Sequence, residues 1–460
     1  MLKYKNNSKN IKKGDIFICT HDIYDDRHKY INDAIKNGCK AIIIDKNIKN
    51  KDDKLFIKVN NTNDTYYQIL NNYYEFPLDN IILTGITGTD GKTTTAMIAN
   101  DILNNFISSA YLGTNGFSFE NKIIKTNNTT PGLDVLFKYL NILNKNECKT
   151  LIMEVSSEGL IHNRCHNINF NIAVLTNINK DHLNIHKNFK NYLKSKTILF
   201  KQTKNGICIL NKDDKHFNYV KRKCKGKILT YGQKKKCDYY FYDIHEYNNK
   251  TTFKLKINNE NFDITSPLLG IFNVYNLVAA IAIVNNYGID IKNIINVISV
   301  LKQVPGRLQK IDFNQNFNII LDYAHTTNAT LEVLNFFKRI NKKNIITVVG
   351  CAGNRYKEKR KEIGKIVTTM SNKVIFTMDD PRNEDVLDII KNMTENVKNN
   401  NYEIIINRKK AIEKALNVAQ KDDLVLILGK GIDNYMAIKN KYLKYNDYDV
   451  IESYFKKLSK

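Results

Sequence analysis

Short, continuously apolar runs alternate with stretches of helical spacing through most of the chain. The runs lie at residues 81–85, 151–155, 172–176 and 206–210 in the middle of the sequence, and at 319–322, 345–350, 373–377 and 424–428 in its last third. Apolar runs of this length between amphipathic helices are typical of strands that are buried on both faces. The alternation therefore predicts an α/β fold with mostly parallel sheets.

Two regions depart from this rhythm. Near the N-terminus, short apolar runs predict strands at 15–19 and 41–45, with a helix over 30–37 between them. Further along the chain, alternating aromatic and polar residues predict antiparallel strands at 239–242 and 253–257.

A turn signal divides the two long α/β stretches. Val304-Pro305-Gly306 follows the last helical pattern of the middle region and precedes the last group of apolar runs. A second change of pattern precedes the run at 81–85. We therefore expect three α/β domains, at residues 1–75, 76–303 and 304–460.

Composition narrows the class of protein. Of 460 residues, 42% are apolar and 25% are charged, which excludes a collagen-like, disordered or small disulfide-bonded chain. No apolar run approaches the roughly 18 residues that a membrane-spanning helix needs. The eight cysteines form no CxxC pair, and no apolar segment follows the basic N-terminus as in a secretory signal. We expect a cytoplasmic protein with reduced thiols and no membrane span.

The net charge of +25 raises the question of a nucleic-acid partner. Lysine is spread along the whole chain beside abundant asparagine and isoleucine, and tryptophan is absent, as AT-rich coding produces. Short runs such as Lys234 to Lys236 are the densest basic segments. The charge therefore does not indicate nucleic-acid binding, and we expect none.

The clearest chemical motif is the segment GITGTDGKTT at residues 85–94, which follows a predicted strand and precedes a helical run. Its glycines let backbone N–H groups approach phosphates, Lys92 can reach the terminal phosphates, and Thr93 can bind Mg²⁺. Ile86 stands where the general P-loop pattern has glycine. The sequence predicts an ATP-binding loop at the end of the first strand of a central P-loop ATPase-type sheet.

This loop and a series of later motifs resemble the Mur ligase family, and most of all its UDP-N-acetylmuramoyl-tripeptide synthetase (MurE) branch. The motifs keep the order of that family over essentially the whole chain. They are NTTP (128–131), MEVSS (153–157), TN (176–177), DHLNIH (181–186), YLKSKTILF (192–200), FNVYN (272–276), PGR (305–307), DYAHT (322–326), GCAGNR (350–355), DDPR (379–382) and GKG (429–431).

The resemblance implies an ATP-dependent ligase that adds a diamino acid to UDP-N-acetylmuramoyl-L-alanyl-D-glutamate through an acyl phosphate, in peptidoglycan synthesis. It implies a domain that binds the nucleotide sugar, a central ATP-binding domain, and a Rossmann-like C-terminal domain that binds the amino acid. We expect the enzyme to act as a monomer on these small molecules.

The resemblance also assigns roles to residues on the ATP side. Lys92, Glu154, His182 and Lys196 are the expected catalytic residues. The metal ligands for Mg²⁺ would be Thr93, Glu154, His182 and a carbamate on Lys196, derived from CO₂. ATP would contact Gly88, Thr89, Asp90, Gly91, Lys92, Thr93, Thr94, Asn273, Asn276, Arg307 and Asp322.

The substrate contacts implied by the resemblance fall into two groups. The nucleotide sugar would meet Ser8, Asn128, Thr129, Thr130, Ser156, His162 and Arg164. Arg164 also suits an anion for its own reason, because a guanidinium binds a pyrophosphate or carboxylate with two hydrogen bonds. The amino acid would meet Arg355, Asp379, Asp380, Pro381, Arg382, Gly429 and Asp433.

Departures from the family pattern leave the amino acid open. The retained Arg355 and Arg382 favour meso-diaminopimelate, because lysine brings no second carboxylate. Asp380 replaces the asparagine of DNPR and could suit the cationic end of lysine or ornithine, and Glu158 replaces a histidine. The alternatives are a ligase for L-lysine or another amino acid, a specialised or folylpolyglutamate-like peptide ligase, and a basic P-loop ATPase that binds nucleic acid.

Overall fold

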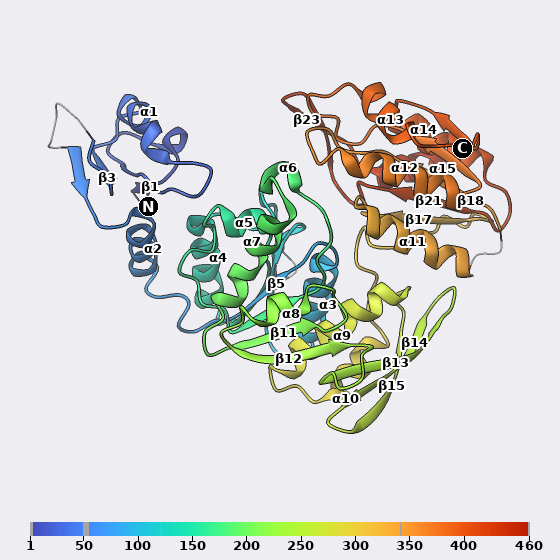
Figure 1. The fold of residues 1–460 in the computed structure, drawn as a ribbon, viewed down its shortest axis with the longest axis horizontal. Coiled ribbons are helices and arrows are strands. Elements are labelled where there is room, and N and C mark those ends of the chain that lie inside the picture. The colour runs from blue at the N-terminus through green and yellow to red at the C-terminus, as the bar shows by residue number, and fades with distance from the viewer. Residues whose placement is uncertain (1–2, 49–54, 121, 341–342, 459–460) are drawn as a thin grey trace.

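The computed structural model describes residues 3–48, 55–120, 122–340 and 343–458. These residues form three α/β units in chain order, each built on its own sheet, together with a two-stranded hairpin. Figure 1 shows the N-terminal unit at the left, the middle unit at the centre and the C-terminal unit at the upper right. No helix in these ranges is long and apolar enough to cross a membrane.

The N-terminal unit is a small parallel sheet in the order β1-β2-β3-β4. Phe17 and Ile42 pack with Ile31 and Ala34 of α1 in its core. Its last helix, α2, buries Leu70 in the core of the middle unit instead. The elements are β1 (Tyr4–Lys5), η1 (Ser8–Asn10), β2 (Ile16–Ile18), η2 (Arg27–Tyr30), α1 (Ile31–Lys36), β3 (Ala41–Ile44), β4 (Phe56–Lys58) and α2 (Thr62–Tyr73).

The middle unit has an 11-stranded sheet in the order β15-β14-β13-β12-β11-β10-β5-β9-β6-β7-β8. Its centre is parallel and both edges are antiparallel. The strands are β5 (Ile82–Thr87), β6 (Ala110–Gly113), β7 (Gly116–Phe119), β8 (Lys122–Ile124), β9 (Thr150–Glu154), β10 (Ile172–Leu175), β11 (Ile207–Asn211), β12 (Lys227–Gly232), β13 (Tyr239–Glu246), β14 (Thr251–Ile257) and β15 (Glu260–Ser266).

Helices cover both faces of this sheet, because successive strand residues point to opposite sides. Ala173 and Leu175 of β10 pack in one cluster with α4 and α7, whereas Ile172 and Val174 pack in another with α3 and α9. The helices are α3 (Lys92–Leu103), α4 (Leu133–Lys145), α5 (Ser157–Ile161), α6 (Leu183–His186), α7 (Phe189–Lys201), α8 (Phe217–Lys221), α9 (Ile271–Asn285) and α10 (Ile291–Ile298).

The C-terminal unit has a six-stranded sheet in the order β16-β17-β21-β18-β19-β20, parallel except at β16. Its elements are β16 (Gln309–Ile311), β17 (Asn318–Asp322), α11 (Thr327–Ile340), β18 (Ile345–Val349), α12 (Glu358–Met370), β19 (Lys373–Phe376), α13 (Val386–Thr394), β20 (Tyr402–Ile404), α14 (Arg408–Val418), β21 (Leu424–Leu428), the hairpin β22 (Tyr435–Ile438) and β23 (Lys441–Lys444), and α15 (Asp447–Leu458).

A buried ion pair fixes α14 against α15. Arg408 Nη2 lies 2.7 Å from Asp447 Oδ2, and both side chains are fully buried. Arg408 also donates a hydrogen bond of 2.9 Å to the carbonyl of Leu428 at the end of β21. The two last helices are thereby attached to the centre of the sheet.

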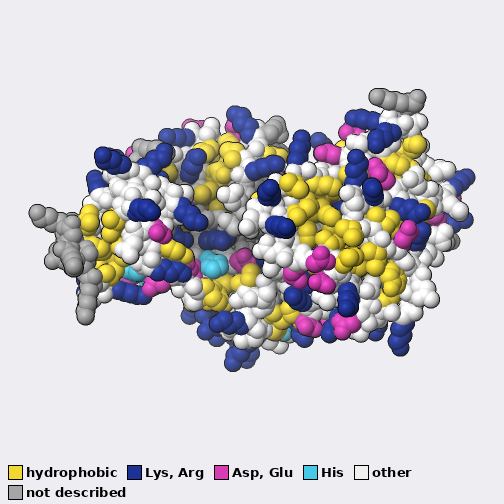
Figure 2. Space-filling model, turned by 90° about the horizontal axis from the view of Figure 1, so that it is seen from above, with side chains coloured by type: hydrophobic (Ala, Val, Ile, Leu, Met, Phe, Trp, Pro, Cys, Tyr) yellow, Lys and Arg dark blue, Asp and Glu magenta, His cyan; other side chains and the backbone are white. Residues whose placement is uncertain are grey.

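The predicted α/β architecture is confirmed. Every apolar run of the two long units coincides with a strand that lies wholly or almost wholly in the interior, and the aromatic alternation coincides with the antiparallel strands β13 and β14. The predicted domain boundaries stay a prediction. Figure 2 shows Lys and Arg side chains spread over this face of the molecule, without one continuous basic block.

Candidate active site

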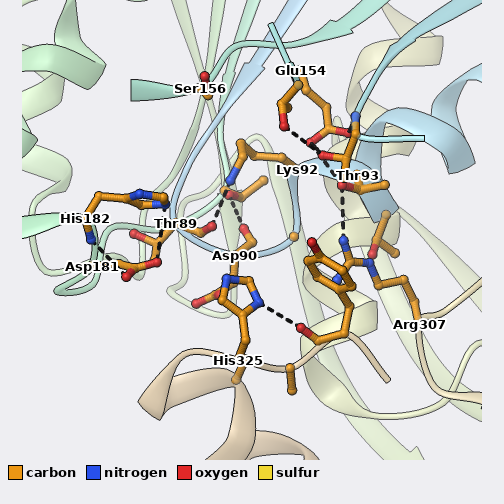
Figure 3. A pocket seen from close by; sticks show the side chains of 18 of the residues that line it. Thr89, Asp90, Lys92, Thr93, Glu154, Ser156, Asp181, His182, Arg307 and His325 are labelled. Carbon is orange, nitrogen blue, oxygen red and sulfur yellow. Dashed lines mark hydrogen bonds and ion pairs between the residues drawn. The ribbon is translucent and has the colours of Figure 1, made fainter. Parts of the chain in front are cut away.

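A large pocket opens where the middle and C-terminal units meet. Its volume is about 1250 Å³, and its lining runs from the phosphate loop and the end of β9 to the loops after β18, β19 and β21. The carboxyl ends of parallel strands are the usual place for ligands in α/β sheets. Figure 3 shows Lys92, Thr93, Glu154 and Arg307 converging on one part of this pocket.

The phosphate loop has the form that a nucleotide needs. Gly91 has φ +83°, and a side chain there would collide with the amide of Asn276, so only glycine fits. No side chain caps the N-terminus of α3, which leaves its N–H groups available to phosphate oxygens. Lys92 donates to the carbonyls of Gly88 (3.0 Å) and Thr89 (2.8 Å), and burial lowers its pKa. The loop fits a nucleotide phosphate.

Glu154 ends β9 and is fully buried. Its Oε2 accepts a hydrogen bond from Thr93 Oγ1 at 2.9 Å, and its Oε1 accepts from Tyr111 Oη at 2.6 Å and from the backbone N–H of Thr114 at 2.9 Å. A carboxylate beside a threonine hydroxyl is a set of hard oxygen donors, which suits Mg²⁺. Tyr111 and Thr114, which sequence reasoning missed, hold this carboxylate in place.

His182 faces two carboxylates. Its Nδ1 lies 3.1 Å from Glu158 Oε1 and its Nε2 lies 3.4 Å from Asp181 Oδ2. The hydrogen bond with His182 lowers the pKa of Glu158 to about 2 against the effect of burial, and the charge of Arg355 adds to this. In the described part of the chain, no three His, Cys, Asp or Glu side chains are grouped to hold a metal ion by themselves. A metal here would also need oxygens from the nucleotide, as is usual for Mg²⁺.

Lys196 lies on α7 behind the phosphate loop and does not line the pocket. Its Nζ donates a hydrogen bond of 2.7 Å to the carbonyl of Gly88 and lies 4.5 Å from the centre of the Tyr192 ring. Burial lowers the pKa of Lys196 well below its usual value, and the nearby charge of Lys92 lowers it further. Both effects favour the neutral amine over the ammonium form.

The remaining residues predicted to bind ATP come from α9 and from the start of the C-terminal unit. Asn276 bonds Asn273 (3.1 Å) and Thr95 (3.3 Å). Arg307 donates to Thr93 Oγ1 at 3.3 Å and stacks over the Tyr323 ring at 4.5 Å. The carboxylate of Asp322 accepts from the N–H groups of Leu308 and Ala324, both at 2.7 Å.

The C-terminal side of the pocket carries a cluster of charges. Lys430 is fully buried, and its Nζ lies 2.9 Å from Asp380 Oδ1, 3.5 Å from Asp433 Oδ2 and 3.9 Å from Asp379 Oδ1. Asp380 has a second cationic neighbour in Arg382, whose Nη2 lies 3.8 Å from Asp380 Oδ2, so its charge is offset within the protein. Arg382 donates to the carbonyl of Gly353 at 2.8 Å and lines the pocket, as does Arg355.

A second, smaller pocket of about 360 Å³ lies between the N-terminal and middle units. It contains the predicted His162, Arg164 and Asn128, of which the last two also line the large pocket. His162 Nδ1 lies 2.9 Å from Asp22 Oδ2 of the N-terminal unit. Sequence reasoning missed Asp22 and the neighbouring pocket residues Thr20, His21, Arg27 and Asn63.

Most of the predicted residues line one of the two pockets, but five do not: Ser8, Gly88, Thr130, Lys196 and Pro381. Thr130 is buried and donates its hydroxyl to the carbonyl of Glu154 at 3.0 Å. Ser8 is buried in η1. Ser156 lines the large pocket, and its Oγ accepts a hydrogen bond from the N–H of Gly159.

Comparison with known proteins gives the class to which this fold and site belong. Residues 86–284 match the Mur ligase middle domain, and residues 306–431 match the Mur ligase, glutamate ligase domain. The chain belongs to the Mur ligase family, and is a ligase of the kind that uses ATP.

Individual relatives lie in one branch of the family. UDP-N-acetylmuramoyl-L-alanyl-D-glutamate--2,6-diaminopimelate ligase of Clostridium botulinum is 34% identical over 99% of this chain and 95% of its own. The ligase of the same name from Oceanobacillus iheyensis is 34% identical over 98% of this chain and 93% of its own. A solved structure under that name has a TM-score of 0.69 and 28% identity, covering 100% of this chain and 96% of its own.

Proposed function

We propose that this Mur ligase uses ATP to add meso-diaminopimelate to UDP-N-acetylmuramoyl-L-alanyl-D-glutamate, in the synthesis of the peptidoglycan precursor. One observation carries the proposal: a single pocket connects a phosphate loop with two arginines of the C-terminal unit and, through Asn128 and Arg164, with the pocket at the N-terminal unit. Two relatives at 34% identity are named as 2,6-diaminopimelate ligases, which supports this amino acid.

On the ATP side, Lys92 and the N–H groups of α3 bind the phosphates. Asn273 and Asn276 lie beside the adenine. Thr93, Glu154, His182 and a carbamate on Lys196 would hold Mg²⁺, which would supply positive charge against the phosphate oxygens during formation of the acyl phosphate. The lowered pKa of Lys196 supports the carbamate, because only a neutral amine reacts with CO₂.

The nucleotide sugar lies across the boundary of the N-terminal and middle units. The uridine diphosphate occupies the smaller pocket, where Arg164 and His162 face the anion, and the dipeptide extends past Thr129 and Ser156 towards Glu154. Arg164 donates to the carbonyl of Thr130 at 3.1 Å, which fixes the guanidinium at the junction of the two pockets.

The incoming amino acid lies against the C-terminal unit. A diaminopimelate carries two carboxylates, and Arg355 and Arg382 are two cations that line its side of the pocket. Asp433 also lines the pocket, and we assign its carboxylate to the side-chain ammonium group of the amino acid. With the amine held near the acyl phosphate, the reaction becomes effectively intramolecular, which lowers its barrier.

The test is release of phosphate from ATP by the purified chain with UDP-N-acetylmuramoyl-L-alanyl-D-glutamate and a panel of amino acids. We expect turnover with meso-diaminopimelate above that with L-lysine, L-ornithine or glutamate, and a single chain in solution by light scattering. A preference for lysine would show that the assigned amino acid is wrong, while the assignment as a ligase would stand. No ligation with any amino acid would overturn the proposal.

A further inference from the structure

Lys359 is a buried lysine whose partner lies on a different unit. It stands at the start of α12 in the C-terminal unit, and its side chain is only 8% exposed. Its Nζ lies 3.6 Å from Oδ1 of Asp181 in the middle unit. Within the described ranges, Asp181 is the one carboxylate in ion-pair distance of this ammonium group.

The neighbouring basic residues behave differently. Lys357 and Arg360 both pair with Glu384, at 3.4 and 2.8 Å, inside the C-terminal unit. Lys361 pairs with Glu358 on the same helix at 3.2 Å. These three pairs do not depend on the middle unit, whereas the pair of Lys359 with Asp181 does.

Burial makes this pair sensitive to the position of the C-terminal unit. Both side chains are less than a tenth exposed, and a buried charge without a partner is strongly unfavourable. If the units moved apart with Lys359 still covered, its ammonium group would lose this carboxylate partner, whereas Asp181 would keep only His182.

Asp181 connects this pair to the candidate site. Its other oxygen lies 3.4 Å from Nε2 of His182, which we assign to the metal. A second contact links the same two units, because Thr326 donates its hydroxyl to Asp90 of the phosphate loop at 3.0 Å. Figure 3 shows Asp90 near the centre of the pocket, with His325 of the C-terminal unit below it and Asp181 to the left.

We propose that Lys359 is a positioning residue of the ligase reaction, which holds the C-terminal unit over the phosphate site through its ion pair with Asp181. The proposal rests on the function proposed above, because it is the amino acid bound by Arg355 and Arg382 that must be brought to the acyl phosphate. Lys359 acts on the geometry of the closed state and not on the affinity for ATP, which the middle unit holds.

The test compares Lys359→Met with Lys361→Met, a matched change at a half-exposed position of the same helix. We expect Lys359→Met to lower kcat at least tenfold and to leave the affinity for a fluorescent ATP analogue within twofold, and Lys361→Met to behave as wild type. Lys359→Arg, which keeps the charge, should recover most of the kcat. Wild-type kcat in Lys359→Met, or a Lys359→Arg variant as impaired as Lys359→Met, overturns the proposal.

A double-mutant cycle separates positioning from direct contact with the substrate. If Lys359 acts through Asp181, then Lys359→Met adds little to the loss caused by Asp181→Asn. Full additivity of the two losses would mean that Lys359 acts on the substrate itself and would overturn the positioning role. Lys359→Gln, which keeps a polar terminus, is carried through the same cycle in case the methionine variant does not fold.

Small-angle scattering with a non-hydrolysable ATP analogue and the UDP-muramoyl-dipeptide added, the condition in which closure is expected, distinguishes failure of this inference from failure of the proposed function. We expect a larger radius of gyration for Lys359→Met than for wild type and Lys361→Met. If the wild type ligates no amino acid but this difference is seen, the ligase proposal fails and the contact between the units stands. If the wild type is active and neither radius nor kcat changes in Lys359→Met, the role of Lys359 is wrong.

Discussion

Lys92 and Glu154 are the residues whose charges the phosphate site depends on most directly. Lys92→Ala and Glu154→Ala should each lower ligation at least about a hundredfold, because each removes a charge that stabilises the transferring phosphoryl group or its metal. The measurement is phosphate release, with circular dichroism to check the fold. Lys292→Ala, on the exposed side of α10, is the control. Near-normal turnover in either site variant would remove the assignment of the ATP site.

Lys196 offers a test that separates a carbamate from a positive charge. Lys196→Ala and Lys196→Arg should both lose most of the activity, because neither side chain can form a carbamate. A small carboxylate such as acetate should restore part of the activity of the alanine variant by entering the space that the side chain leaves. An active arginine variant would disprove the carbamate and leave the hydrogen bond to Gly88 as the role of this lysine.

Asp433 should make the stability of the protein depend on pH. Burial raises its pKa from 3.8 to about 6, although Lys430 opposes the shift, so the folded state binds more protons than the unfolded state between these values. Stability therefore falls as pH rises through this window. Between pH 5 and pH 8 the free energy of unfolding should fall by about 1.4 kcal/mol more in the wild type than in Asp433→Asn. Unfolding of both proteins at the two pH values measures the difference, and parallel changes would contradict it.

At the scale of elements, the hairpin of β22 and β23 fixes the loop that carries Arg382. The N–H of Arg382 bonds the carbonyl of Ala437 at 2.9 Å, the N–H of Lys439 bonds the carbonyl of Arg382 at 2.6 Å, and the N–H of Ala437 bonds Asp380 Oδ1 at 2.9 Å. Backbone bonds of this kind survive replacement of a side chain. These bonds hold the loop without the guanidinium, which adds its own hydrogen bond to the carbonyl of Gly353.

Arg382→Ala should accordingly change the choice of amino acid without disturbing the loop. A charge-assisted hydrogen bond is worth roughly 1.5–3 kcal/mol, so the variant should lose at least about tenfold in kcat/KM for meso-diaminopimelate. Use of L-lysine should change much less, because lysine has no second carboxylate. Lys441→Ala, exposed on β23, serves as the control. The choice of diaminopimelate would be refuted if the wild type preferred lysine and Arg382→Ala left kcat/KM unchanged.

The central strands could be predicted from sequence because both of their faces are buried, which produces continuous apolar runs such as Leu424–Leu428. Edge strands give no such signal. All residues of β8 and β23 are exposed, and these runs of three and four mixed residues are too short to be distinguished from a loop. The hairpin that fixes Arg382 was therefore beyond sequence reasoning, although the arginine itself was found from its motif.

The residues of the site also differ in whether the sequence reveals them: some belong to a recognisable motif, and others only support those residues through contacts. Glu154 and His182 could be named from their motifs, but Tyr111, Thr114 and Lys359 could not. Those three act through contacts between distant segments, and nothing in a tyrosine on a strand or a lysine on a helix distinguishes them beforehand. The pairing of Asp380 with Lys430 was missed for the same reason, since the two are 50 residues apart.

At the scale of the whole molecule, the three units must come together for turnover. In the proposed reaction, the middle unit binds ATP and the C-terminal unit binds the amino acid, so we expect only a closed form to bring the amine to the acyl phosphate. Small-angle scattering should show compaction when a non-hydrolysable ATP analogue and the UDP-muramoyl-dipeptide are added together. Either ligand alone should have a smaller effect. A profile that stays unchanged with both ligands would argue against closure.

The buried pair of Arg408 and Asp447 determines when, during translation, the C-terminal unit can finish folding. Domains generally fold as units while the polypeptide is being made, beginning at the N-terminus. Arg408 begins α14, yet its carboxylate partner is 39 residues further along the chain. Until the ribosome has added Asp447, the guanidinium of Arg408 cannot be buried as half of this ion pair. The C-terminal unit therefore completes its core late in translation, when the ATP-binding unit has long been available to fold.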